Sequence, residues 1–415
     1  MKIRFLLVLA LAVLLGGCVG TPDEEGWRSS QKKEFLKILE TDKYASICNQ
    51  KALYEKVKQT ENSKLMSKLL VAYTWNLANS CIDLKSFKAA QKAKRAKKIK
   101  TRYETYMQEV KASDILMKLK AGQSIEKILK PYVPEYHQFH DLIRTYGLLK
   151  NDSNISSDTL YKIRLNIERV KLMKPYHEKN YALVNIPEYV VRIIENDQTA
   201  LSMAVVVGKK RLQTPIFSTD LKYITLNPQW SVPDSIARNE IIPKTLKNPN
   251  YLKAHRMVIR RDYNLNSPAL SFNAVNPKAY VGGKGPVPFK FIEVPSKKNG
   301  LGRVKFIFPN HHSVYMHDTQ SKYLFKRKVR MYSHGCVRLS EPQAMLEHIT
   351  KNYTSVSQEE VKKWYDSMKT HYIPVTKRLL VHTAYFTAYV DECGQLLLFN
   401  DIYGFDKSQK LNFIP

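Results

Sequence analysis

The spacing of apolar residues changes near residue 180, and this change limits the fold more than any other feature of the sequence. In the first part, apolar side chains recur at helical spacing, as at Leu69, Tyr73 and Leu77. In the second part, runs rich in β-branched residues, such as YALVNI and LSMAVVVG, are typical of strands. Helices followed by strands indicate an α+β chain. We therefore expect an N-terminal, all-helical scaffold domain over residues 31–178 and a mostly-β domain over residues 180–407.

Three further patterns divide the mostly-β domain. From Leu379 to Val390 the chain is rich in β-branched and aromatic residues, and the turn sequence DECG separates this run from the return strand QLLLFNDIYG. Residues 341–351 predict a short helix that begins after a Ser-Glu-Pro signal. Between residues 228 and 300 the chain is rich in Pro, Asn and Lys and only weakly periodic. A long segment without clear elements is usually functional or disordered, so we expect an insertion there.

The first residues are typical of an export signal. Lys2 and Arg4 precede an apolar stretch that is too short to cross a bilayer comfortably as a permanent helix. The stretch ends in LGGC, and small residues before Cys18 resemble a bacterial lipobox. This pattern predicts a signal peptide over residues 1–17, lipidation of the cysteine, and a lipidated tether over residues 18–30. An ordinary secretory signal with a chance cysteine is the alternative.

Lipidation would place the chain outside the cytoplasm. Acyl chains on Cys18 hold a protein at a membrane surface without a spanning helix. Val19, rather than Asp, follows the cysteine, which favours the outer membrane over the inner one. The expected location is therefore the periplasm, with a lipid anchor in a membrane.

The chain is strongly basic, since 67 Lys and Arg against 37 Asp and Glu give a formal net charge of +30. In a cytosolic protein this charge would suggest nucleic acid. An exported chain meets phospholipid headgroups and the carboxylate-rich cell wall instead, so we expect no nucleic-acid partner. Nine of the cations lie between Asp83 and Glu104, where no acidic residue occurs. This stretch is either a solvated helix face or a contact with anionic lipid or wall polymer.

Five cysteines divide among different expected roles. Cys18 is assigned to lipid. Cys48 and Cys81 both fall in helix-like sequence, and an oxidising compartment permits a disulfide between them, although sequence alone does not show that they are close. Cys393 falls in the predicted hairpin turn, and we interpret it as incidental. Cys336 is the remaining thiol.

The stretch MYSHGCVRLS places Cys336 among residues that can change its reactivity. A thiol near its ordinary pKa of about 8.5 is mostly protonated at neutral pH, so a nucleophilic cysteine needs a base or a cation nearby. His334 and Arg338 are each two residues away and share a face with the cysteine if the segment is extended. Gly335 permits close approach of the backbone to a ligand, and the amides of Gly335 and Cys336 are candidate oxyanion donors.

A second motif, SVYMHDT, lies upstream and supplies another candidate base. Val314 and Met316 alternate with Tyr315 and His317, so the phenol and the imidazole should project from the same strand face. Asp318 follows immediately and is a candidate for orienting the imidazole. The two motifs together offer a cysteine, a histidine, an orienting group and a phenol that can donate to an oxyanion.

These motifs resemble the signature of the L,D-transpeptidase catalytic domain, the YkuD-like family. The likeness includes the order of His317-Asp-Thr and Ser333-His-Gly-Cys-Val-Arg338, and blocks such as GLGRVKFIFPNHHSVYMHDT, and covers roughly residues 181–406. It implies that Cys336 is the nucleophile, that His317 is its general base, and that Asp318 orients the base, possibly through its carbonyl. The resemblance assigns the oxyanion and substrate region to Tyr315, Ser333, His334, Gly335 and Arg338. It also makes the insertion at about 228–300 a substrate cap, with Asn227 and Trp230 at its entrance.

The reaction implied by the resemblance is acyl transfer in the cell wall, without a cofactor or a metal. Cys336 would attack the third-position diamino acid carbonyl of a tetrapeptide stem and release D-alanine. An acceptor amine would then take the acyl group and form a cross-link between third-position residues. The expected partners are peptidoglycan stem peptides and, through Cys18, a membrane surface. The helical domain is either a scaffold or a docking site for cell-wall synthesis proteins.

Several alternatives remain open at this point. The same residues serve an L,D-carboxypeptidase that admits water, or the attachment of a protein lysine to the wall. A lipoprotein with an inactive domain could merely tether wall to membrane. A zinc hydrolase would use His311, His312, His317, His334 and Cys336. A papain-like enzyme usually places its cysteine before its histidine, and a sortase places its arginine further along. Large family members often carry a separate peptidoglycan-binding module, which is not evident here, so wall affinity is expected from the basic surface or the cap.

Overall fold

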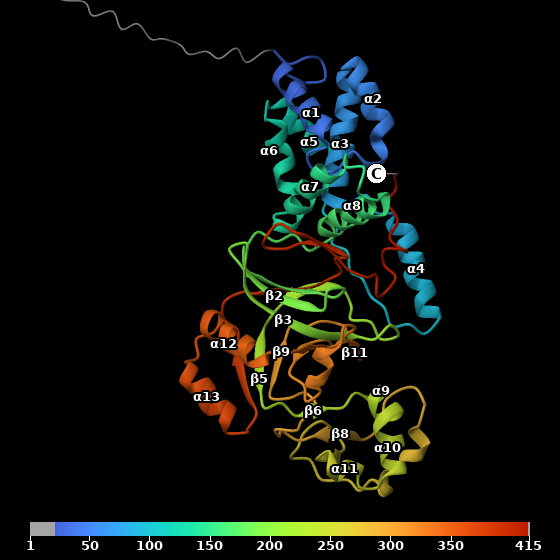
Figure 1. The fold of residues 1–415 in the computed structure, drawn as a ribbon, viewed down its shortest axis with the longest axis vertical. Coiled ribbons are helices and arrows are strands. Elements are labelled where there is room, and N and C mark those ends of the chain that lie inside the picture. Colours follow the sequence, from blue (N-terminus) through green and yellow to red (C-terminus); the bar gives the residue numbers. More distant parts are fainter. Residues whose placement is uncertain (1–20, 414–415) are drawn as a thin grey trace, which may run out of the picture. The chain divides into compact units, whose positions relative to one another are not determined.

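The computed structural model describes residues 21–413 (Figure 1). The predicted signal peptide, Cys18 and the first residues of the tether lie outside the described residues. In the part that is described, no helix combines the length and the apolar composition needed to cross a membrane. Helices come first and most strands follow, which confirms the α+β class expected from the sequence.

The chain divides into two compact units, each discontinuous in sequence. Of the described residues, the first unit takes 21–81, 107–134 and 412–413, and the second takes 82–106 and 135–411. This division differs from the boundary near residue 180 that the change of periodicity suggested. The helices between residues 135 and 178 belong with the sheet and not with the first helices.

Short helices build the first unit. They are α1 (Ser29–Thr41), η1 (Cys48–Gln50), α2 (Lys51–Thr60), α3 (Ser63–Asn79), α5 (Ala112–Lys120), α6 (Ile125–Leu129) and η2 (Lys130–Tyr132). Asn62 caps α3 by accepting a hydrogen bond from the Leu65 amide. Inside, the ring of Phe35 stacks on Trp27 with centroids 5.7 Å apart and meets Tyr73 edge-on at 6.2 Å. The helical spacing of the sequence therefore predicts this core correctly.

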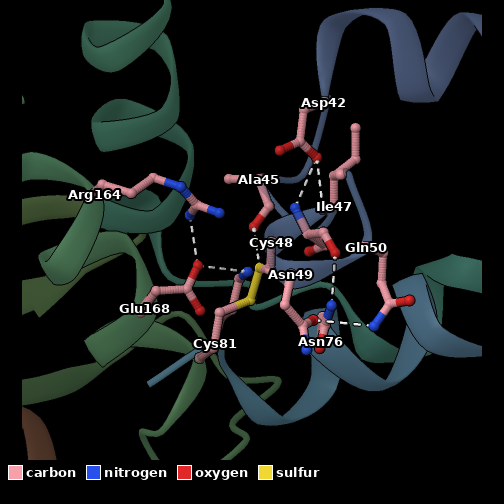
Figure 2. Close-up of a disulfide and its surroundings, with 12 residues drawn as sticks. Asp42, Ala45, Ile47, Cys48, Asn49, Gln50, Asn76, Cys81, Arg164 and Glu168 are labelled. Atoms are coloured by element: carbon pink, nitrogen blue, oxygen red, sulfur yellow. Dashed lines mark hydrogen bonds and ion pairs between the residues drawn. A yellow bond between two sulfur atoms is a disulfide. The ribbon is translucent and has the colours of Figure 1, made fainter. Parts of the chain in front are cut away.

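A disulfide joins Cys48 and Cys81 in the first unit, as the sequence analysis allowed (Figure 2). Their Cα atoms lie 6.1 Å apart, within the usual range for a bridge. Hydrogen bonds support the turn before Cys48: the Asp42 carboxylate accepts from the Ser46 amide at 2.7 Å, and the Asn76 amide donates to the Ser46 carbonyl at 3.0 Å. The bridge thus links this turn to the segment that follows α3.

Two helices of the second unit pack on the C-terminal hairpin. They are α7 (His137–Leu149) and α8 (Ser157–Lys171), and the hairpin is formed by β15 (Ala388–Val390) and β16 (Leu396–Leu398). The Gln138 side chain donates to the Val390 carbonyl at 2.5 Å and accepts from the Val390 amide at 3.0 Å. The Asn166 side chain accepts from the Thr387 amide at 3.0 Å. These buried amides hydrogen-bond to the backbone of the hairpin and of the segment before it, which explains why both helices belong with the sheet.

Eleven of the described strands form one sheet in the second unit. They are β1 (Tyr181–Asn185), β2 (Val190–Glu195), β3 (Gln198–Gly208), β4 (Phe217–Asp220), β5 (Tyr223–Leu226), β9 (Val304–Ile307), β10 (Met316–His317), β11 (Met331–Ser333), β12 (Val337–Leu339), β13 (His371–Pro374) and β14 (Leu380–Ala384). Their order is β13-β5-β9-β10-β12-β3-β2-β1-β14-β4, and β11 pairs with β3. The pairs β1–β14, β10–β12 and β11–β3 are parallel, and the other pairs are antiparallel.

The main core lies on one face of this sheet. Alternate strand residues such as Phe306 and Met316 point into it. Helix α12 (Pro342–Tyr353) covers the core with side chains such as Met345, and α13 (Gln358–Asp366) follows. The first of these helices is the one predicted after the Ser-Glu-Pro signal. The second was not predicted.

An extended strap, residues 97–106, follows α4 (Leu84–Ala96) in the second unit. The sequence analysis assigned this region to helix, but Lys98 adopts a left-handed conformation with φ 59° and ends the helix. Lys100 pairs with Leu212 and Tyr103 with Ile216 in isolated parallel bridges. The strap therefore runs along the segment between β3 and β4, where its backbone finds hydrogen-bond partners.

The insertion between β5 and β9 is folded. Its elements are β6 (Trp230–Ser231), α9 (Asp234–Ile236), the π-helical turn η3 (Ala237–Ile241), α10 (Ile242–Lys247), α11 (Tyr251–Ala254), β7 (Met257–Arg260), η4 (Asn273–Val275), η5 (Pro277–Tyr280) and β8 (Lys290–Glu293). The three strands form an antiparallel sheet in the order β6-β8-β7. Ile242, Phe289 and Phe291 are among the residues of its own small core. A local sequence window did not reveal this core because its members are spread over the whole insertion.

Candidate active site

Two neighbouring parallel strands bring the two sequence motifs together. Met316 on β10 lies opposite Val337 on β12, and both side chains belong to the main core. The pairing continues one residue earlier, where the Val337 amide donates to the Tyr315 carbonyl at 3.0 Å. Because side chains alternate along a strand, the neighbours of these core residues project from the opposite face. Those neighbours are Tyr315, His317, Cys336 and Arg338.

Cys336 is a partly exposed free thiol immediately before β12. Its Sγ lies 3.8 Å from the carbonyl oxygen of Ser313, to which the thiol can donate a weak hydrogen bond. Burial raises the pKa of the Cys336 thiol, whereas hydrogen bonds from Tyr315 and the positive charge of Lys305 lower it. The net shift is upward, so the resting thiol is protonated and needs a base during attack.

His317 is buried and neutral. Its Nδ1 lies 2.5 Å from the backbone carbonyl oxygen of Asp318, so Nδ1 carries the proton and donates to that carbonyl. This tautomer leaves Nε2 as a proton acceptor. Burial, helped by the charge of Arg338, lowers the pKa of His317 to about 3. At neutral pH the imidazole is therefore available as a base.

The carboxylate of Asp318 fixes the turn that holds the imidazole. It accepts from the Arg303 amide at 2.9 Å and the Thr319 amide at 2.7 Å, and it pairs with Lys322 at 2.8 Å. Gly302 has φ 65°, and a Cβ there would lie 2.1 Å from the carboxylate. Asp318 thus orients the histidine through its carbonyl, as the resemblance implied, while its side chain holds the backbone in place.

Ser333 holds the loop that carries the cysteine. Its hydroxyl accepts from the Gly335 amide at 3.1 Å and donates to the Cys336 carbonyl at 2.5 Å. The Thr214 hydroxyl donates to the Gly335 carbonyl at 2.9 Å. Gly335 has φ 122°, which favours glycine. The Gly335 amide was predicted as an oxyanion donor, but it is already bonded to Ser333 in this structure.

His334 faces the insertion and not the thiol. Its Nε2 lies 2.7 Å from a carboxylate oxygen of Glu240 on η3. Burial lowers the pKa of His334, and the Glu240 carboxylate opposes that shift. The motif histidine therefore connects the catalytic loop to the predicted cap. Sequence reasoning did not find Glu240, because nothing in its local pattern marks it.

Two cations flank His317 on the same face. In the strand register, His317 lies opposite Arg338 on β12 and opposite Lys305 on β9. The Lys305 ammonium lies 4.0 Å from the centroid of the Tyr315 ring. The Nε atom of Arg338 is buried without a hydrogen-bond partner in the described chain. Lys305 was missed, although its alternation with Val304 and Phe306 in RVKFIF places it on the active face.

Tyr315 keeps its proton in this setting. Burial and the neighbouring Cys336 thiol raise the pKa of the Tyr315 phenol well above its ordinary value. The hydroxyl is therefore a hydrogen-bond donor across the working pH range. This supports the predicted placement of a phenol beside the reacting sulfur.

The two residues predicted at the entrance of the insertion have different surroundings. The Asn227 side-chain amide donates to the carbonyls of Trp364, Tyr365 and Lys369, and its oxygen accepts from Arg303 at 2.6 Å. Asn227 is thus part of the scaffold between β5 and α13. Trp230 lies on β6, is partly buried, and packs against the core of the insertion.

The histidine-rich zinc alternative does not match these contacts. His312 Nε2 pairs with Glu104 at 2.8 Å, and His334 pairs with Glu240. The His317 ring donates to the Asp318 carbonyl. These three rings therefore have separate partners in the structure.

A family comparison agrees with this geometry. The model of the YkuD family, described as the L,D-transpeptidase catalytic domain, matches residues 179–357. The matched segment includes both motifs and the whole insertion, so this part of the chain is similar to YkuD L,D-transpeptidase domains.

Proteins similar to this chain come from several bacteria. A Haemophilus influenzae protein, provisionally named an L,D-transpeptidase, is 27% identical over 281 residues. The match covers 67% of this chain and 54% of the relative, so the chain spans about half the length of that protein. Similar solved structures include an L,D-transpeptidase from Mycobacterium smegmatis, at 12% identity and a TM-score of 0.21, and L,D-transpeptidase 3 from Mycobacterium tuberculosis, at 9% and 0.22. Each covers 49% of this chain, and the matches span 58% and 60% of those chains.

Proposed function

We propose that the protein is a peptidoglycan L,D-transpeptidase in which Cys336 is the nucleophile and His317 the general base. The observation that carries this proposal is the neutral imidazole, held by the Asp318 carbonyl, on the same face and the adjacent strand as the thiol. A general base must be unprotonated at the working pH to accept a proton, and a fixed hydrogen bond keeps its acceptor nitrogen in one orientation.

The first half-reaction forms a thioester. The Cys336 sulfur attacks the carbonyl of the third-position diamino acid while His317 Nε2 takes the thiol proton. The Tyr315 hydroxyl is a donor for the oxyanion that develops. When the carbon–nitrogen bond breaks, the leaving D-alanine takes the proton from His317. The lysine and arginine that flank the imidazole disfavour its charged form, which assists this return of the proton.

The second half-reaction transfers the acyl group. An acceptor amine attacks the thioester, His317 takes a proton from the amine, and the sulfur leaves and regains a proton. The product is a cross-link between third-position residues. If water replaces the amine, the same residues act as an L,D-carboxypeptidase and leave a tripeptide. The folded insertion, joined to the catalytic loop through His334 and Glu240, favours transfer because it can exclude water from the thioester.

Purified muropeptides test this proposal. Incubation of the chain with tetrapeptide muropeptides should release D-alanine and form dimers, which mass spectrometry separates from tripeptide monomers. Tripeptides without dimers would support the carboxypeptidase instead. An unchanged tetrapeptide would support a wall-tethering protein without activity.

We further propose that the protein is a periplasmic lipoprotein anchored through Cys18, with the outer membrane favoured. The lipobox-like LGGC sequence and the export signal support this location. The helices of the first unit would serve as a scaffold or a docking site for cell-wall synthesis proteins. Incorporation of labelled palmitate that is lost in Cys18→Ala, followed by membrane fractionation, tests the anchor.

A further inference from the structure

The basic stretch between Asp83 and Glu104 has no role in the catalytic face described above. One of its cations is structural, since the Lys94 ammonium donates to the Tyr403 carbonyl at 2.9 Å and to the Gly404 carbonyl at 3.3 Å. Other cations of the stretch surround a cavity of about 120 Å³ between α4 and the strap. We call this cavity the α4 pocket.

One face of α4 forms one wall of the α4 pocket. Leu84, Lys88, Gln91 and Arg95 follow each other at intervals of three or four, which places them on the same side of a helix, and Phe87 lies beside Lys88. The strap supplies the other wall with Arg102, Tyr103 and Thr105. Phe87 is buried, and its ring meets Tyr103 edge-on at 5.3 Å, so a packed aromatic pair supports the cavity.

The α4 pocket has positive charge without a protein counter-charge. Lys88, Arg95 and Arg102 form no ion pair with any residue between 21 and 413, and no carboxylate is found among the lining residues. Gln91 is 5% exposed; its side-chain oxygen accepts from the Thr101 hydroxyl at 2.8 Å, but its amide nitrogen has no partner in the described structure. Unpaired donors beside three cations are complementary to an anion.

The strap connects the α4 pocket with the catalytic loop. A second, smaller cavity is lined by Lys100, Thr101 and Arg102 together with His334 and Gly335. Arg102 lines both cavities. A hydrogen bond of 3.0 Å from the Gln213 amide to the Lys100 carbonyl fixes the strap beside this loop. A row of cations therefore leads from the α4 pocket to the loop that carries Cys336.

We propose that the α4 pocket binds a carboxylate of peptidoglycan, on a stem peptide that neighbours the stem held at Cys336. This assignment rests on the proposed function. Guanidinium groups such as those of Arg95 and Arg102 match a carboxylate with two parallel hydrogen bonds. The site is a cavity, and its lining residue Arg102 also lines the second cavity beside the loop of Cys336, which suits a peptide of the wall polymer better than the flat surface of a membrane. The pocket would thus hold the wall beside the enzyme in place of a separate wall-binding module.

Two variant pairs with equal loss of charge test the α4 pocket. The pocket pair is Lys88→Gln with Arg95→Gln. The control pair is Lys85→Gln with Lys92→Gln, on exposed positions of the same helix that do not line the cavity. All are made in the full chain with Cys336→Ala, so that binding is measured without turnover. Thermal unfolding checks that both pairs retain the fold.

Binding is measured by co-sedimentation with three probes: purified peptidoglycan sacculi, sacculi whose carboxyl groups have been amidated, and vesicles of phosphatidylglycerol and phosphatidylethanolamine. The pocket pair should weaken binding to native sacculi by about tenfold, and the control pair by about twofold at most. Amidated sacculi should bind both pairs and the parent chain equally weakly.

Three outcomes would overturn the proposal. An equal loss in both pairs would show nonspecific attraction. Full binding to amidated sacculi would exclude carboxylates as the ligand, and a selective loss of vesicle binding in the pocket pair would indicate a lipid site. A failure of the proposed function would be seen in a different experiment, in which the unmodified chain leaves soluble tetrapeptides unchanged. Sacculus binding by the Cys336→Ala chain does not depend on that result.

Discussion

His334 Nε2 and a Glu240 carboxylate oxygen lie 2.7 Å apart and join the catalytic loop to the folded insertion. The two residues are far apart in sequence: His334 lies in the loop before Cys336, and Glu240 lies in η3 of the insertion. His334 therefore links the insertion to the loop that carries Cys336.

Glu240→Gln should loosen this link. Both side chains are about one-third exposed, so the pair contributes on the order of 1 kcal/mol, and we expect kcat/KM for muropeptide cross-linking to fall by about fivefold. The ratio of tripeptides to dimers should rise, because a looser insertion admits water. Lys244→Gln is the control, since it breaks only the neighbouring 3.5 Å pair of Glu240. An unchanged ratio of tripeptides to dimers in Glu240→Gln would show that the insertion does not limit the access of water to the thioester.

Ser333→Ala should impair catalysis by releasing the cysteine loop. The change leaves the Gly335 amide and the Cys336 carbonyl without their partner, at a cost of about 1–3 kcal/mol in the free energy of unfolding. A displaced sulfur should lower kcat by about 100-fold. Ser340→Ala is the matched control, because the Ser340 hydroxyl has no hydrogen-bond partner in the described part of the chain. Similar kcat values for the two variants would contradict this role of Ser333.

Lys305→Met should make the thiol harder to ionise. The Lys305 charge lowers the pKa of Cys336, so its removal raises that pKa. The rate of alkylation by iodoacetamide, which reports the thiolate, should fall about tenfold at pH 7, and its pH profile should move to higher pH. Lys305→Arg keeps the charge and should keep most of the rate. An unshifted profile in Lys305→Met would mean that Lys305 does not act on the sulfur.

Removing the disulfide should destabilise the first unit. The bridge closes a loop between residues 33 apart, which corresponds to about 4 kcal/mol in the chain-entropy account. The double variant Cys48→Ser with Cys81→Ser should therefore have a lower unfolding temperature in the first unit. Calorimetry measures this temperature. Cys393→Ser, at an exposed free thiol, is the control. If the double variant and the control unfold at the same temperature, the bridge contributes nothing to stability.

The sequence predicted the residues of the active face because the relevant rule is local. Alternation along a strand places Tyr315 and His317 together, and the same rule places Cys336 with Arg338. Asp318 orients the imidazole through its backbone carbonyl, which depends only on the next residue in the chain. Patterns within a few residues of each motif were thus sufficient to place these side chains on one face, although Lys305 on the neighbouring strand was missed.

What the sequence could not predict depends on long-range partners. Glu240 reaches His334 only because the insertion has a core of its own. Asn227 was expected to line the substrate, yet its amide holds the backbone of α13. The sequence around Gln138 and around Asn166 predicts helices, but it does not predict the hairpin on which these helices pack. In each case a polar side chain found its partner through the tertiary fold.

The measurement that most directly tests the central claim is the intact mass of the protein after incubation with a carbapenem. The account predicts a single covalent adduct on the unmodified chain and none on Cys336→Ala, whose thermal unfolding should remain unchanged. His317→Gln should form the adduct much more slowly, because the thiol then lacks its proton acceptor. An adduct on Cys336→Ala, or equal rates with and without His317, would contradict a mechanism in which this imidazole activates this sulfur.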